Sequence, residues 1–223
     1  MAEKQKHHGG VVWDLPVRLF HWLLAVSVIV SIASVKNENM FIHEKSGLTI
    51  IGLLVFRIIW GMAGSPHARF ARFLVSPQAV LGYIRQRLDG DRRYHPGHAP
   101  TGGYATMVIL LVLLVMAGLG LMANDDVLYE GPLALWAGDF SATASRWHHL
   151  IEKLVFAIIV LHLAAIGFYR LVLDQKLIPP MITGGHDPAV AKTGLPKQLA
   201  GLLLLAGCVV IAQVLGYDAN RFY

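Results

Sequence analysis

The feature that most constrains this chain is one apolar run at residues 147–168, WHHLIEKLVFAIIVLHLAAIGF. A helix of this length and composition is able to cross a bilayer. It carries His148 near its start and His162 fourteen residues later, nearly four whole turns, so both imidazoles lie on one face about 21 Å apart along the axis. Ligand-capable side chains are costly inside a membrane helix and usually mark function, so the run predicts two buried sites at different depths.

The composition as a whole also indicates a membrane protein. Of the 223 residues, 55% are hydrophobic and 15% are charged, which is too apolar for an ordinary soluble domain. We expect an all-α integral membrane protein with a four-helix transmembrane bundle and a fifth C-terminal transmembrane helix. The five apolar runs lie at about residues 17–35, 42–62, 104–122, 147–168 and 199–216.

Cysteine content and charge exclude several classes of protein. The single cysteine, Cys208, excludes internal disulfides, covalent haem attachment through C-x-x-C-H and a four-cysteine iron–sulfur cluster. The formal charge of +5 does not indicate nucleic acid, because membrane proteins concentrate Lys and Arg on the cytoplasmic side. The polar start of the chain and the length of the first apolar run predict no cleavable signal peptide.

The distribution of basic residues predicts the orientation. Lys and Arg gather in the N-terminal tail, in the connection at residues 63–102 and in the connection after the fourth run, all on one side of the membrane. The N-terminus should therefore be cytoplasmic and Tyr223 periplasmic, in a bacterial inner membrane. The motif HARFARF should contact anionic lipid. The acidic outer connection at residues 123–146 is either a docking surface for a basic partner, such as a periplasmic c-type cytochrome, or a solvated loop.

This topology pairs four histidines by depth. His21 and His162 should lie near the inner face, and His43 and His148 near the outer face. Two imidazoles from facing helices hold a haem iron on both sides and leave no open position, which suits electron transfer. Two such pairs predict two haems across the bilayer. A single four-coordinate metal centre would need all four histidines close together, which the depths exclude.

Two arginines and three further histidines are candidates for supporting roles. Arg57 lies fourteen residues after His43 and shares its face, where it would balance a haem propionate or polarise a quinone oxygen; alternatively it extends to the cytoplasmic interface. Arg18, one turn before His21, has the same two interpretations. The basic connection holds three histidines that either donate protons to a quinone or, as we expect, lie beside lipid headgroups: His67, His95 and His98.

The motifs around these residues resemble the bacterial cytochrome b561 family, which includes the cytochrome b subunits of nickel–iron hydrogenases and small di-haem quinol oxidoreductases. The resemblance covers residues 12–183. It implies two non-covalent haem b groups and electron exchange with ubiquinone or menaquinone. His149 stands where many members have Glu. The motifs are FHW at His21, IHEKSG at His43, RIIWG after Arg57, WHH at His148 and LH at His162.

These observations lead to one main hypothesis and three alternatives. Residues 1–183 would form the di-haem domain, and residues 184–223 a linker and an extra helix. The chain would pass electrons between quinone and a redox partner. It is alternatively the haem-bearing anchor of a periplasmic hydrogenase or dehydrogenase, or a stand-alone quinone-linked superoxide oxidase. A histidine-containing transporter is disfavoured, because the histidines form two pairs and do not line one path.

Overall fold

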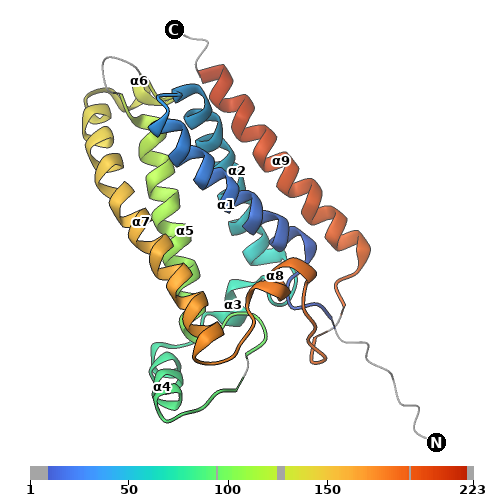
Figure 1. The fold of residues 1–223 in the computed structure, drawn as a ribbon. Helices are drawn as coiled ribbons and strands as arrows, with labels where there is room; N and C mark the ends of the chain where they lie inside the picture. Colours follow the sequence, from blue (N-terminus) through green and yellow to red (C-terminus); the bar gives the residue numbers. More distant parts are fainter. Residues whose placement is uncertain (1–9, 94, 125–128, 191, 220–223) are drawn as a thin grey trace, which may run out of the picture.

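The chain folds into a bundle of long helices (Figure 1). The computed structural model describes residues 10–93, 95–124, 129–190 and 192–219. Within these residues five helices are long and apolar enough to cross a membrane, which confirms the all-α, five-span prediction. They are α1 (Leu15–Lys36), α2 (Met40–Ala63), α5 (Pro100–Met122), α7 (Ser141–Leu171) and α9 (Leu195–Ala219).

Capping residues set where the helices begin. Asp14 accepts a hydrogen bond from the Val17 amide at 2.9 Å, and Asn39 caps α2 through the Ile42 amide at 3.0 Å. Each cap satisfies one of the unpaired amides of a first turn. Helix α7 begins six residues before its apolar run. The apolar run marks only the part of the helix that the membrane would surround, and the helix extends into polar residues before that part.

Short helices mark the two ends of the bundle (Figure 1). One end carries α3 (Phe70–Phe73), α4 (Pro77–Leu88) and α8 (Ile178–Thr183), and is called the α4 end. The opposite end carries α6 (Ala134–Ala137) and η1 (Gly138–Phe140), and is called the α6 end. Helix α1 begins at the α4 end and α9 ends at the α6 end. The N-terminal tail, Tyr223 and two acidic residues of the outer connection, Asp125 and Asp126, lie outside the described residues, and so do the expectations for them.

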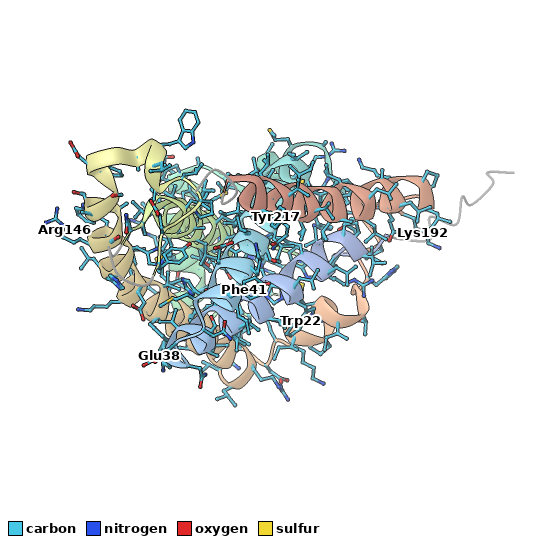
Figure 2. All side chains as sticks on the ribbon, turned by 90° about the horizontal axis from the view of Figure 1, so that it is seen from above. Trp22, Glu38, Phe41, Arg146, Lys192 and Tyr217 are labelled. Carbon is cyan, nitrogen blue, oxygen red and sulfur yellow. The ribbon has the colours of Figure 1, made fainter. Side chains whose placement is uncertain are left out.

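Helix α2 is the most buried of the five and lies between the others. Leu53 and Phe56 are fully buried in its centre. On one side α2 packs against α1 and α9, and on the other α5 pairs with α7. Figure 2, seen from above, shows the two sides: α7, with Arg146 pointing outward, lies on the left, and α9 lies on the right.

The α8–α9 linker packs against the start of the chain. The Trp13 amide donates to the Gly184 carbonyl at 2.8 Å, and Gly10 pairs with Asp187 as an isolated bridge. Asp187 also bonds His67 Nε2 at 2.9 Å, with both side chains largely buried. The division into residues 1–183 and 184–223 stays a prediction, but residues on both sides of it are directly bonded to each other.

This packing corrects our expectation for two histidines of the basic connection. His67 lies inside the α4 end against Asp187. His98 packs its ring 4.1 Å from Phe73 and 4.8 Å from Trp13, between ring centroids. Both side chains contact other protein groups at this end, and neither is an exposed surface histidine. The reason is that residues from three connections converge here, and such long-range packing leaves no local pattern in the sequence.

Candidate haem sites

The histidine pair at the α6 end has the geometry of two ligands to one metal. His43 and His148 lie with ring centroids 6.1 Å apart and ring planes at 89°. Two imidazoles that share one metal, each with a metal–nitrogen bond of about 2 Å, hold their ring centres roughly 6 Å apart. The pair therefore sits at the separation that a bis-imidazole site needs. His43 stands one turn into α2, and His148 stands two turns into α7.

A cavity of about 200 Å³ opens beside this pair. Both histidines line it, and Gly47, Ala117 and Gly120 contribute small residues to its wall. A Cβ built on Gly120 would lie 2.9 Å from His148 Cε1, so only glycine lets the imidazole lie so close to α5. Small residues around two facing imidazoles provide room for a flat macrocycle.

Hydrogen bonds fix the orientation of both rings at the α6 end. His43 Nδ1 lies 3.0 Å from the Ser31 carbonyl oxygen and 3.1 Å from Ser31 Oγ. His148 Nδ1 lies 2.9 Å from the Met116 carbonyl oxygen. A ring whose Nδ1–H donates to a carbonyl carries its lone pair on Nε2, the usual ligating atom. The residues present at this end therefore fit a haem iron.

The sequence contained no signal for these two carbonyl partners. Only residues 37–39 connect α1 and α2, so the first turn of α2 returns beside the last turns of α1, where Ser31 lies. Met116 comes from α5, thirty-two positions from His148 along the chain. Both contacts depend on how helices pack, and periodicity within one helix does not report that.

The second pair lies toward the α4 end. His21 is on the second turn of α1, and His162 is on α7. Among the described residues the two rings form no ring contact like that of His43 and His148, and the side chain of His162 is exposed. His21 Nδ1 is buried and has no hydrogen-bond partner within the described residues, and the ring packs edge-on against Trp22 at 5.0 Å between centroids. Each of the two helices therefore offers an imidazole of the kind that a haem iron requires at this end, and their pairing stays a prediction.

Aliphatic side chains line a cavity of about 40 Å³ between the levels of the two pairs, and these side chains are called the aliphatic layer. Val28 lies seven residues after His21, and Val155 lies midway between the two histidines of α7. The lining consists of Val28, Ile109, Val112, Leu113, Val155, Ile158 and Ile159.

The structure gives the two arginines protein partners. Arg57 is only 2% exposed, so it does not extend to the membrane interface. Its Nη1 donates to the Ala68 carbonyl at 3.0 Å, and its buried Nη2 has no hydrogen-bond partner among the described residues. Arg18 Nη1 donates to the Ile182 carbonyl of α8, and its buried Nε likewise has none among those residues. Trp22 Nε1 bonds the same segment, at the Met181 carbonyl (Figure 2).

His149 differs from its neighbour. It borders the same cavity, but its side chain is exposed, and no hydrogen bond orients it within the described residues. Among those residues no three His, Cys, Asp or Glu side chains gather as a metal centre.

The fold and these histidines define a class: a membrane-embedded helical bundle with a pair of imidazoles in a cavity at one end and further histidines toward the other. A model of the prokaryotic cytochrome b561 family matches residues 12–184, and the chain belongs to this family. It is a multi-pass membrane cytochrome of b type, a haem-bearing electron-transfer protein. The match stops before α9, so the fifth helix lies outside the family's common region.

Relatives at modest identity carry consistent names. A probable Ni/Fe-hydrogenase B-type cytochrome subunit of Bradyrhizobium diazoefficiens is 23% identical over 209 residues, covering 78% of this chain and 84% of the relative. The protein of the same name from Azotobacter chroococcum is 25% identical over 218 residues, covering 81% and 89%. The probable Ni/Fe-hydrogenase 1 B-type cytochrome subunit of Escherichia coli is 23% identical over 209 residues, covering 78% and 88%. No solved structure matches.

Proposed function

We propose that this cytochrome holds two haem b groups and carries electrons across the bacterial inner membrane between the quinone pool and a redox partner. The observation that carries the proposal is the α6-end pair, whose 6.1 Å separation and carbonyl-bonded Nδ1 atoms suit iron ligation through Nε2. His43 and His148 would hold one haem, and His21 and His162 the other. Haem b between two imidazoles supplies one-electron transfer at an iron without an open position.

The chain's own residues would do three things in this function. The imidazoles hold the two groups at different depths. The Ser31 and Met116 carbonyls keep the α6-end rings in one tautomer and orientation. The aliphatic layer between the pairs keeps water out of the space that electrons cross.

We further propose that the α4 end faces the cytoplasm, which puts the N-terminus inside and the C-terminus in the periplasm. Support comes from the basic residues of that end, because Lys and Arg favour the cytoplasmic side. Those in the connection between α2 and α5 are Arg69, Arg72, Arg85, Arg87, Arg92 and Arg93.

The first test is haem quantitation and a reduced-minus-oxidised visible spectrum of the purified chain. We expect two low-spin haems, with His21→Ala and His43→Ala each removing a different one. Reduction by ubiquinol or menaquinol would then identify the quinone. A haem content that neither variant changes would overturn the ligand assignment, and a chain without visible absorption would overturn the function.

The names of the relatives favour one partner, a nickel–iron hydrogenase docked at the α6 end. Purification from native membranes under mild detergent should then recover a metal-containing hydrogenase with the chain. Reduction of a c-type cytochrome by the isolated chain would favour a soluble electron carrier instead. Quinone-dependent superoxide consumption by the single chain would favour the stand-alone oxidase.

A further inference from the structure

The two histidine pairs differ in how their Nδ1 atoms are bonded. At the α6 end, His43 Nδ1 lies 3.0 Å from the Ser31 carbonyl, and His148 Nδ1 lies 2.9 Å from the Met116 carbonyl. At the α4 end, His21 Nδ1 is buried without a partner, and His162 forms no hydrogen bond within the described part of the chain. One pair is thus supported by two carbonyls, and the other by none.

Charge differs between the two ends in the same sense. Glu152 lies one turn after His148 on α7 and lines the cavity, together with Glu44 and Lys36. Glu44 is paired with Lys45 at 3.0 Å, and Lys36 offsets Glu152, so the charges around this cavity balance. At the other end the nearest charge along α1 is a cation, Arg18, one turn before His21.

The difference in hydrogen bonding and the difference in charge both make the midpoint potential lower at the α6 end than at the α4 end. A carbonyl that accepts the Nδ1 proton makes the imidazole a stronger donor, and a stronger donor stabilises ferric over ferrous iron. A nearby carboxylate also favours the more positive ferric state, and a nearby cation disfavours it. Ligand hydrogen bonding therefore lowers the potential at the α6 end, and the cation Arg18 raises it at the α4 end.

We infer that the haem at the α6 end has the lower midpoint potential of the two, and that Ser31 and Met116 are positioning residues that set this order. The inference rests on the two-haem function proposed above. It assigns a redox role to backbone and hydroxyl groups that touch the ligands and not the iron. An electron would then lose free energy when it moves from the haem at the α6 end to the haem at the α4 end.

The structure offers side-chain variants that disturb each contact. Ser31→Ala removes the Oγ that lies 3.1 Å from His43 Nδ1 and leaves the carbonyl. Gly120→Ala introduces a Cβ 2.9 Å from His148 Cε1 and 3.2 Å from its Nδ1, which pushes the ring away from the Met116 carbonyl. Gly118→Ala is the matched control on the same helix, because a Cβ there has no neighbour within 4 Å.

The test is a potentiometric titration of the purified full-length chain with its haems bound, followed in the visible spectrum. Two reduction steps are expected in the wild type. Ser31→Ala and Gly120→Ala should raise the lower step, with the larger shift in Gly120→Ala, and leave the upper step in place. Gly118→Ala should leave both unchanged. His21→Ala should retain only the lower step.

Several outcomes would overturn the inference. The first is that both haems of the wild type are reduced at one potential. The second is that the potential of the upper step changes in the Ser31 or Gly120 variant. The third is that the potential of the lower step changes in neither variant. If Gly120→Ala releases a haem, the lost step has to be the lower one; loss of the upper step reverses the assignment. A wild type with one haem or none refutes the two-haem function itself, and the inference falls with it.

Discussion

At the scale of single residues, the adjacent histidines at the start of α7 are distinguished by their surroundings. His148 has its Nδ1 bonded and its ring 6.1 Å from His43, whereas His149 is exposed. We expect His148→Ala to halve the haem content and His149→Ala to retain all of it, because only the first removes an oriented ligand. A haem assay on both variants decides this, and equal loss in both would contradict the assignment.

His98 provides a pH-dependent prediction. Burial, together with the nearby charges of Arg57 and His67, lowers the pKa of His98 to about 3. In the unfolded chain an imidazole binds a proton near pH 6.5, so between about pH 6.5 and pH 3 the unfolded state holds the extra proton. Stability from the neutral ring is therefore complete above pH 6.5 and falls as the pH drops through this window.

The measurement is thermal unfolding in detergent at pH 5, 6 and 7. The wild type should lose up to about 1 kcal/mol of stability per pH unit from this residue. His98→Phe keeps an aromatic ring against Trp13 and Phe73 but has no proton to bind, so its stability should depend less on pH. A variant with the wild-type slope would show that His98 is not responsible.

The residue scale also shows what the sequence could and could not predict. The helical period placed His148 and His162 on one face, and the charge bias assigned depths, so the sequence alone selected the four histidines as candidates; their role as haem ligands stays a prediction. The carbonyls of Ser31 and Met116 were not, since every residue has a carbonyl and only packing selects two. Arg57 was expected in the interior, and it is buried, but its contact with Ala68 depends on a loop that sequence periodicity does not describe.

At the scale of helices, α9 is fitted to α2 through glycine. A Cβ on Gly52 would lie 2.6 Å from Val209 Cα, and Gln213 Nε2 bonds the Lys45 carbonyl at 2.8 Å and Thr49 Oγ1 at 2.9 Å. Close approach of two backbones at small residues is a common way for membrane helices to associate. The sequence predicted α9 as a span but not its neighbour, because its apolar faces are nearly equivalent.

Gly52→Ala should therefore weaken the packing of α9. We expect a loss of about 1–3 kcal/mol in stability, as for an overpacked core, measured by thermal unfolding in detergent. Gly207→Ala is the control on α9, because a Cβ there meets nothing within 4 Å. Equal effects in the two variants would mean that helix propensity, and not the α2–α9 contact, governs the result.

At the scale of the whole molecule, the proposed orientation is testable at two exposed positions. Trp136 at the α6 end is 89% exposed, and Leu88 at the α4 end is 81% exposed. In a Cys208→Ser background, Trp136→Cys should react with a membrane-impermeant maleimide in spheroplasts. Leu88→Cys should react only after the membrane is opened. The reverse pattern would invert the topology, because the two positions lie at opposite ends of the bundle.

The aliphatic layer between the histidine pairs has a consequence for energy conversion. The side chains that line its cavity are all Val, Leu or Ile, so they offer no polar group to carry a proton beside an electron. An electron that passes between the two proposed haems would therefore move net charge through the insulating part of the membrane. Such a step is electrogenic: about 2.3 kcal/mol per 100 mV is gained or lost for a charge that traverses the full field, in proportion to the depth covered. The membrane voltage should therefore shift the distribution of electrons between the two ends of the protein.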